Sequence, residues 1–202
     1  TPGIRAAMPN PSVGAMIVHN QEIIGAGCTQ PFGGNHAEVE AFNAISSSEN
    51  LSDATLYVTL EPCSHHGNTP PCTDLIIQSG IKHVVIGSLD PNALVNGSGI
   101  NRLKSSGINV EVGPMQAECE LLNKRFYTFH QKKRPYIILK WAQTADGFID
   151  KLRKNNEEGI HWITHPETKK ITHQWRSEEA AIVIGTNTAI NDNPNLTVRA
   201  AS

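Results

Sequence analysis

The chain has 202 residues and a formal net charge of −2, which is long enough for one or two domains with a sizeable core. Lys and Arg are scattered along it, so the charge pattern predicts no nucleic-acid partner and no membrane surface held by bulk charge. The sequence contains no run of about 18 apolar residues, so it predicts no transmembrane helix. The first residues do not have the pattern of a signal peptide, and we expect a cytoplasmic protein.

The first part of the chain alternates between strand and helix patterns. We expect a hairpin with strands over 13–18 and 22–27 and a turn at Asn20-Gln21, then a helix over 36–45 and a strand over 54–60. A short helix over 73–79 ends at Gly80. A buried strand over 83–87, a helix over 99–106, a strand over 108–112 and a helix over 116–129 follow. This alternation predicts a layered α/β domain, which we place at residues 1–131.

The composition changes at residues 131–135, where a basic stretch ending in Pro135 predicts a hinge. Beyond it we expect a strand over 136–141, a turn at Asp146-Gly147, a helix over roughly 166–175 and a buried strand over 180–185. The chain ends about 65 residues after the hinge, which is short for an independent domain. We therefore expect residues 135–202 to be the N-terminal part of a second domain that is incomplete in this chain.

The strongest chemical signal is a set of one histidine and two cysteines. His36 precedes Glu38 by two residues, and Pro62-Cys63 and Cys72 follow. One imidazole and two thiolates are the three protein ligands of an open catalytic zinc site, whose fourth position is left to water. The same order of residues is already known from zinc-dependent nucleobase deaminases. We predict His36, Cys63 and Cys72 as zinc ligands and Glu38 as the residue that carries a proton from the water to the departing amine.

The predicted ligands also lie where helices are expected to begin. Helix N-termini carry partial positive charge, which favours thiolate over thiol at Cys63 and Cys72. A competing interpretation is a closed structural zinc site with His65 or His66 as the fourth ligand. A disulfide between the two cysteines is another, although nothing indicates a secreted protein. The open site fits the pattern best.

Other residues near the motif have simpler interpretations. Glu61 is a second carboxylate close to the ligands, but Pro62 separates it from them. Cys28 and Cys119 lie outside the motif, and we expect both to be small buried side chains.

At these motifs the sequence resembles the bifunctional deaminase–reductase of riboflavin biosynthesis, over nearly its whole length. The matching segments are 9–14, 33–38, 59–65, 69–72 and 90–92, then 134–136, 139–142, 146–147, 162–164, 175–176 and 196–199. The eight residues between Cys63 and Cys72 distinguish this family from cytidine deaminases, whose cysteines lie closer together. The resemblance implies a cytidine-deaminase-like three-layer α/β/α domain followed by the start of a dihydrofolate-reductase-like α/β domain.

The resemblance also implies two reactions on a small phosphorylated substrate. The first is zinc-dependent deamination of 2,5-diamino-6-ribosylamino-4(3H)-pyrimidinone 5′-phosphate, and the second is NADPH-dependent reduction of the ribosyl group to ribityl. It implies Zn²⁺ and NADPH as cofactors and a homo-oligomer. Asn10 and His65 match positions near the pyrimidine, and the Asn10 amide suits a ring edge with one donor and one acceptor, although it is also a turn residue between two prolines.

In the second domain the resemblance assigns two groups of residues. Positions near the nicotinamide dinucleotide are Ala142, Trp162, Thr188 and Asp192, and positions near the substrate phosphoribosyl group are Arg176, Leu196 and Arg199. A core aromatic is an equally good interpretation of Trp162, and a solvated surface is the simpler one for the arginines.

Some positions depart from the family pattern. Thr29 replaces a common His, Asn68 replaces a common Lys or Arg, and Ile160 replaces a common Ser, while the loop over 151–159 is longer than usual. The loss of a cation at Asn68 removes a partner for phosphate, which affects substrate affinity but not the zinc chemistry. We expect the chain alone to be a competent deaminase and a poor or inactive reductase. The alternatives are a deaminase of another base or nucleotide, such as guanine or a deoxycytidine phosphate, and a non-catalytic deaminase scaffold beside a reductase.

Overall fold

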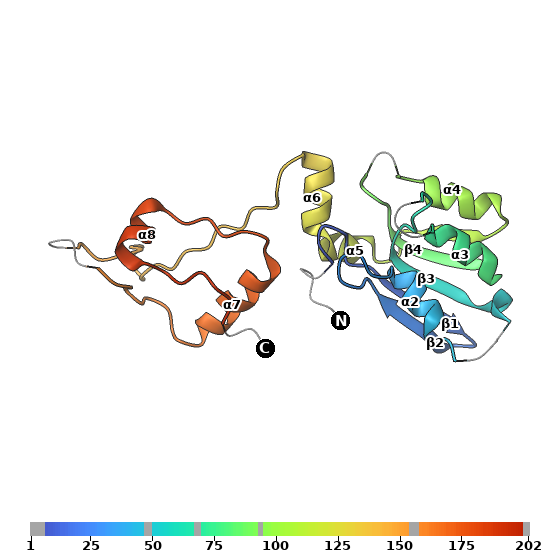
Figure 1. Ribbon diagram of the computed structural model, residues 1–202, viewed down its shortest axis with the longest axis horizontal. Coiled ribbons are helices and arrows are strands. Elements are labelled where there is room, and N and C mark those ends of the chain that lie inside the picture. The colour runs from blue at the N-terminus through green and yellow to red at the C-terminus, as the bar shows by residue number, and fades with distance from the viewer. Residues whose placement is uncertain (1–6, 47–49, 67–69, 93–94, 154–157, 200–202) are drawn as a thin grey trace. The chain divides into compact units, whose positions relative to one another are not determined.

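The computed structural model describes residues 7–46, 50–66, 70–92, 95–153 and 158–199 (Figure 1). Contacts divide the chain into two compact units, Thr1–Tyr136 and Ile137–Ser202. The first unit contains all four residues of the predicted zinc motif and is built around one sheet.

The sheet of the first unit has five strands in the order β2-β1-β3-β4-β5. The strands are β1 (Gly14–His19), β2 (Glu22–Cys28), β3 (Thr55–Leu60), β4 (His83–Ser88) and β5 (Asn109–Val112). β1 runs antiparallel to β2 and β3, whereas β3, β4 and β5 are parallel. The predicted hairpin is confirmed, because Asn20 and Gln21 both have positive φ, at 50° and 66°, as a tight turn between twisted strands requires.

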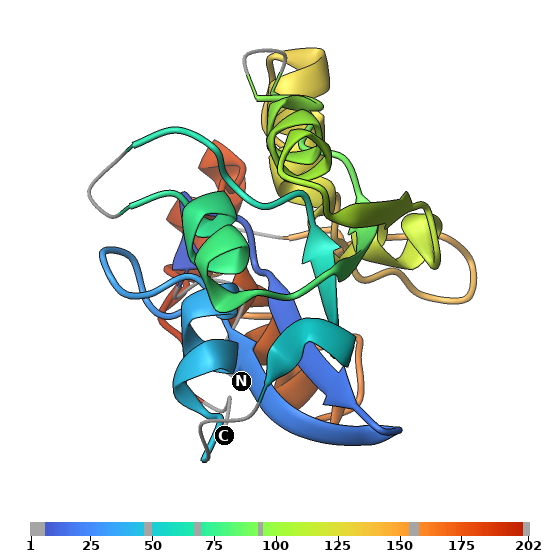
Figure 2. The same cartoon turned by 90° about the vertical axis from the view of Figure 1, so that its right-hand side faces the viewer.

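Helices cover both faces of this sheet (Figure 2). The described helices of this unit are α2 (Ala37–Asn43), α3 (Cys72–Ser79), α4 (Ser98–Ser105), α5 (Gln116–Leu122) and α6 (Lys124–Lys132), with a 3₁₀ turn η1 at Leu51–Asp53. α2, α3 and α4 share the main core with the sheet, in which Leu56 and Ile86 are fully buried. α5 packs on the opposite face, where Cys119 touches Gly87. The predicted three-layer α/β/α arrangement is thereby confirmed.

The prediction of a single helix over 116–129 is wrong, because the helix is interrupted at Asn123. α5 ends at Leu122 and α6 begins at Lys124. The Asn123 side chain accepts a hydrogen bond from the Ser12 N–H at 2.8 Å and donates one to the Ser12 carbonyl at 2.9 Å. A side chain that pairs with a distant backbone in this way competes with the regular helix, and here it ties the α5–α6 junction to the start of the chain.

Two glycines of β2 determine how closely α2 approaches the sheet. A Cβ atom at Gly27 would overlap the Ala37 carbonyl oxygen and the Ala41 nitrogen, and one at Gly25 would overlap the Ala41 carbonyl oxygen. Only glycine leaves room for helix backbone at this distance. The close contact fixes the first turn of α2, which carries two of the predicted site residues.

The second unit contains two helices among its described residues, α7 (Thr168–Glu178) and α8 (Thr186–Asp192). The turn at Asp146-Gly147 is present, with a Gly147 N–H to Thr144 carbonyl bond of 2.9 Å. The strands expected over 136–141 and 180–185 are not formed. A buried strand needs neighbours for its backbone groups, and no described residue of this unit pairs with either segment. Leu139 and Val183 are accordingly 78% and 94% exposed. Within the described parts of both units, no helix combines the length and apolar character needed to cross a membrane.

Candidate metal centre and its pocket

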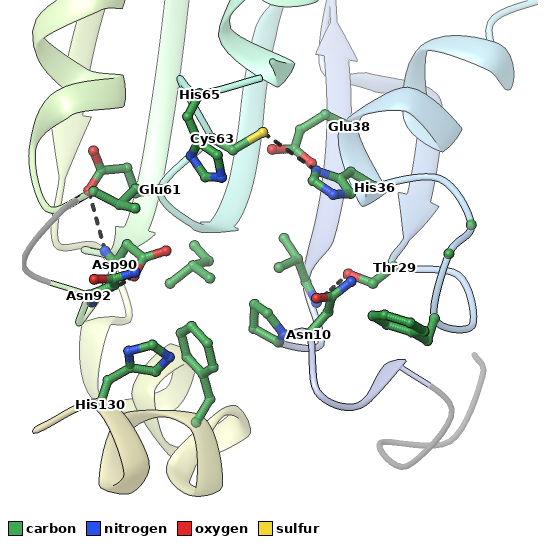
Figure 3. Close-up of a pocket in the computed structure, with 18 residues that line it drawn as sticks. Asn10, Thr29, His36, Glu38, Glu61, Cys63, His65, Asp90, Asn92 and His130 are labelled. Atoms are coloured by element: carbon green, nitrogen blue, oxygen red, sulfur yellow. Dashed lines mark hydrogen bonds between the residues drawn. The ribbon is translucent and has the colours of Figure 1, made fainter. Parts of the chain in front are cut away.

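The three predicted ligands come from three elements that end or begin at one side of the sheet. His36 is the N-cap residue of α2, and Cys72 is the first residue of α3. Cys63 lies just beyond the end of β3. Their ligand atoms all lie within 4.8 Å of one another. The His36 Nδ1 atom is 3.2 Å from Cys72 Sγ and 3.6 Å from Cys63 Sγ, so the structure brings together three side chains that are far apart in the sequence. Figure 3 shows two of them, His36 and Cys63.

These distances fit a tetrahedral zinc ion. Zinc bonds of about 2.3 Å to sulfur and about 2.0 Å to nitrogen place a sulfur and a nitrogen about 3.5 Å apart. Among the described residues, no fourth His, Cys, Asp or Glu belongs to the cluster. His65 and His66 are both described, and neither completes a closed set of ligands. The donor set therefore suits a three-ligand zinc site with one open position.

Hydrogen bonds hold the two cysteines in place. The backbone N–H of Cys72 donates to Cys63 Sγ at 3.3 Å, and the Thr73 N–H donates to the Cys63 carbonyl at 3.1 Å. Both donors belong to the first turn of α3, whose N–H groups have no partner within the helix. The start of α3 thus supplies one cysteine and binds the segment that carries the other.

The two thiols differ in pKa, because one donates a hydrogen bond to the other. A hydrogen bond from the Cys72 thiol is the main reason that the pKa of Cys63 is lowered to about 4. The same bond, followed by burial, raises the pKa of Cys72 above its usual range. The pKa of His36 is raised, first through its hydrogen bond with Cys63. Cys63 is therefore the sulfur that already carries the negative charge a metal ion needs.

Glu38 is a buried carboxyl group beside the ligand cluster. It lies in the first turn of α2 and is 4% exposed. Figure 3 shows its carboxyl group next to His36 and Cys63, on the side that faces the pocket. Burial is the main reason that its pKa is raised, with the neighbouring Cys63 charge adding to the effect. A carboxyl group with a raised pKa is suited to accept and return a proton near neutral pH.

A pocket of about 370 Å³ opens next to these groups. Its wall includes Asn10 and His65, the two residues that the sequence placed near the ring of a substrate. Thr29 lines the pocket as well, and its hydroxyl accepts a hydrogen bond from the Val13 N–H at 2.9 Å. Thr29, which replaces a His common in the family, therefore lines the pocket and also fixes the segment that follows Asn10. Asn68, the other departure, lies outside the described residues.

The wall opposite the ligands had no predicted site residue, although segment 90–92 is among those that resemble the family. Asp90, Asn92 and Val95 follow β4, and Phe126 and His130 come from α6 (Figure 3). Burial raises the pKa of Asp90. The position of Asp90 and Asn92 just after a parallel strand was a usable signal, because ligands bind at the carboxyl ends of such strands. No comparable signal marked the two α6 residues, which lie after the break at Asn123.

In the second unit two of the predicted phosphoribosyl residues, Arg176 and Arg199, lie near one buried histidine. The His173 Nδ1 atom accepts a hydrogen bond from the Arg199 N–H at 3.3 Å. Arg176 donates to the Asn195 carbonyl at 3.4 Å, next to the half-buried Leu196. Burial lowers the pKa of His173, and the charges of Arg176, Arg199 and Lys169 lower it further. The structure thus places both arginines near a common centre.

The predicted dinucleotide residues have other partners. Trp162 is 57% exposed, and the Lys169 ammonium group lies 3.7 Å from the centre of its ring. Asp192 accepts a hydrogen bond from Arg153 at 2.9 Å. Thr188 lies exposed on α8, and Ala142 is half-buried in an irregular segment.

Two family models match the chain. Residues 4–88 match the cytidine and deoxycytidylate deaminase zinc-binding region, and residues 135–202 match the RibD C-terminal domain. The two matched ranges cover the zinc ligands and the whole of the second unit.

Curated and solved relatives agree with both matches. The riboflavin biosynthesis protein RibD of Aquifex aeolicus is 49% identical over 95% of this chain and 52% of its own length. A diaminohydroxyphosphoribosylamino-pyrimidine deaminase of Buchnera aphidicola is 50% identical over 59% of this chain and 80% of its own length. The solved structure of Acinetobacter baumannii RibD superposes with a TM-score of 0.89 at 37% identity, over 98% of this chain and 54% of that one. The chain spans about half the length of the RibD proteins it matches. The chain belongs to the RibD family of riboflavin biosynthesis proteins.

Proposed function

We propose that this chain is a zinc-dependent deaminase of 2,5-diamino-6-ribosylamino-4(3H)-pyrimidinone 5′-phosphate. The observation that carries the proposal is the cluster of His36, Cys63 and Cys72 with the buried Glu38 at the edge of a pocket. The Buchnera aphidicola relative that bears the name of this deaminase matches the chain at 50% identity, which supports the choice of substrate.

The reaction replaces a ring amino group by oxygen and consumes one water for each ammonia released. A zinc ion held by His36, Cys63 and Cys72 would supply a Lewis acid that lowers the pKa of water. Glu38 takes up the proton that the water loses and delivers it to a ring nitrogen. It then takes a second proton from the hydroxyl group added to the ring and delivers it to the leaving amine, which departs as ammonia. Its raised pKa suits both halves of this transfer.

The remaining pocket residues orient the substrate. The Asn10 amide offers a donor and an acceptor to the edge of the pyrimidine, and His65 adds a ring nitrogen on the ligand side of the pocket. The described pocket lining contains no Lys or Arg. The phosphate of the substrate is therefore expected to rely on neutral donors and histidines, which predicts a higher KM than in relatives that carry a cation at the position of Asn68.

We propose that the second unit contributes to NADPH-dependent reduction of the ribosyl group in the whole protein. The match of residues 135–202 to the RibD C-terminal domain supports this assignment. The exposed, unpaired segments around Leu139 and Val183 support the further expectation that this chain alone reduces its substrate poorly. For the whole protein we propose a cytoplasmic homo-oligomer without a nucleic-acid partner. Light scattering on the purified protein tests the oligomeric state.

A substrate panel tests the proposed deaminase. Ammonia release by the zinc-loaded chain is compared among the ribosylamino phosphate, the same base without phosphate, guanine and deoxycytidine monophosphate. We expect kcat/KM to be highest for the ribosylamino phosphate, by about 100-fold or more, because the polar walls of the pocket would be left without partners by the smaller ligands. Preference for guanine or deoxycytidine monophosphate would identify a different deaminase. No ammonia from any of them, with zinc present, would favour a scaffold.

A further inference from the structure

Glu61 is a buried carboxylate between the metal ligands and the opposite wall of the pocket. It directly follows β3, lies two residues before Cys63 and is 4% exposed. Its Oε2 atom accepts hydrogen bonds from the N–H groups of Asp90 at 3.3 Å and Gly97 at 3.0 Å. Its Oε1 atom accepts from Gly99 at 2.9 Å and from Ile100 at 3.4 Å. One side chain therefore binds two segments that lie more than 25 residues further along the chain.

The chemistry of these bonds requires a carboxylate. An ionised carboxylate accepts hydrogen bonds at both oxygens and donates none, which matches four N–H donors. Gly97 is the N-cap of α4 and provides no side-chain cap. The N–H groups at the start of a helix have no partner within it, and Glu61 supplies the missing acceptors from a neighbouring strand. Figure 3 shows the Glu61 carboxylate directed to Asp90 and not to the zinc ligands.

Backbone packing fixes the same junction. A Cβ atom at Gly99 would overlap the Pro62 carbonyl oxygen and would come within 3.2 Å of Glu61 Oε1. α4 thus begins in direct contact with the segment that leads to Cys63. Between Asp90 and Gly97 lie Asn92 and Val95, which line the pocket. Glu61 holds both ends of this wall, at Asp90 and at Gly97.

We propose that Glu61 is a positioning residue for substrate binding: it fixes the pocket wall at Asp90, Asn92 and Val95 relative to Cys63. The inference rests on the proposed deaminase function and deepens it, because it divides the two buried carboxylates between two tasks. Glu38 carries the proton. Glu61, whose two oxygens are occupied by four backbone donors, sets the affinity for the part of the substrate that the wall contacts.

The kinetic test is Glu61→Gln, with zinc content measured for each protein. The glutamine amide turns an NH₂ group toward one of the two donor pairs, so that pair loses its acceptor. We expect KM for the ribosylamino phosphate to rise about tenfold while kcat stays within about threefold. Ser79→Ala is the matched control, because it removes two hydrogen bonds at the far end of α3, which the pocket does not include, and it should leave KM unchanged. A loss of kcat of about 100-fold or more at unchanged KM would assign Glu61 to proton transfer and overturn the proposal.

A second variant keeps the carboxylate and moves the wall. Gly99→Ala places a methyl group against the Pro62 carbonyl, so α4 must shift away from Glu61. We expect the same direction of change, a higher KM with little change in kcat. An unchanged KM in a folded, zinc-loaded Gly99→Ala protein would contradict the proposal.

Amide hydrogen exchange separates this inference from the proposed function, because it needs no substrate. In the wild-type chain the N–H groups of Asp90, Gly97 and Gly99 should be protected from exchange. In Glu61→Gln one pair of donors, either Asp90 with Gly97 or Gly99 with Ile100, should exchange about tenfold faster than the same pair in Ser79→Ala. If the wild type releases no ammonia from the ribosylamino phosphate, the proposed function fails, and the exchange data still decide whether Glu61 holds the wall. Equal exchange in all three proteins would overturn that role.

Discussion

The Nδ1 atom of His36 lies 3.2 Å from the Sγ atom of Cys72, although the two residues are 36 positions apart. The contact joins the start of α2 to the start of α3, and Cys63 completes the cluster from the end of β3. Two of the three ligands lie at helix starts, and the first turn of α3 binds the segment that carries the third, so the ligands are held by regular structure.

Zinc binding should release protons from the chelator-stripped chain. The pKa of Cys63 is lowered to about 4, so this sulfur is ionised at neutral pH, whereas the raised pKa of Cys72 keeps its proton in place. Zinc needs both thiolates, so we expect about one proton or more to leave per zinc ion and the affinity to fall as the pH is lowered. Calorimetry in buffers of different ionisation enthalpy measures this number. His65→Ala should bind zinc equally well, and a large loss of affinity would revive the closed four-ligand site.

Replacement of Glu38 by glutamine should stabilise the folded, chelator-stripped chain near neutral pH. The pKa of Glu38 is raised in the fold from the usual 4.5, mainly by burial, so ionised Glu38 opposes folding at pH values above the raised pKa. This cost declines as the pH falls through the folded pKa and disappears below the unfolded value. We expect Glu38→Gln to gain about 1 kcal/mol in the free energy of unfolding, a gain that vanishes in acid. Chemical denaturation at both pH values measures it. Glu40→Gln in the same helix should show no such gain, and an equal gain there would contradict the explanation.

The contact between β2 and α2 should be sensitive to one methyl group. Gly27→Ala forces a Cβ atom against the Ala37 carbonyl and the Ala41 nitrogen, so α2 must move. We expect a loss of about 1–3 kcal/mol in the free energy of unfolding and weaker zinc binding, since His36 begins this helix. Gly14→Ala, on the adjoining strand, meets only an ordinary 3.8 Å contact with the Thr59 methyl group and serves as the control. Equal stability and zinc affinity in the two variants would mean that the contact does not position the helix.

The local parts of this structure could be predicted from the sequence, because short-range patterns determine them. The turn at Asn20-Gln21 and the helix end at Gly80 each depend on neighbours within a few residues. The ligand set joins distant segments and was predicted from its residue types and their order. The part of the wall formed by Phe126 and His130 could not be predicted, because it depends on tertiary packing and not on a local pattern. The helix break at Asn123 was missed for the same kind of reason, since its side chain pairs with Ser12, 111 residues away.

Hydrophobic pattern alone was also insufficient in the second unit. The segments around Leu139 and Val183 have the composition of buried strands, yet both side chains are largely exposed. A strand forms only where another strand satisfies its backbone groups, and composition does not reveal whether that partner is present. For Glu61 the sequence showed only a second carboxylate close to the zinc motif, which competed with Glu38 for the role of proton carrier. The structure explains this carboxylate by its four hydrogen bonds from distant backbone N–H groups.

The most direct test of the account is ammonia release from 2,5-diamino-6-ribosylamino-4(3H)-pyrimidinone 5′-phosphate by the wild-type chain and by Glu38→Gln, both shown to hold one zinc ion. Glutamine keeps the shape of the side chain and cannot carry the proton. We predict rapid release by the wild type and a kcat lower by about 100-fold or more in the variant. Release by the variant at a similar rate would remove Glu38 from the mechanism, and no release by the wild type would contradict the proposed function itself.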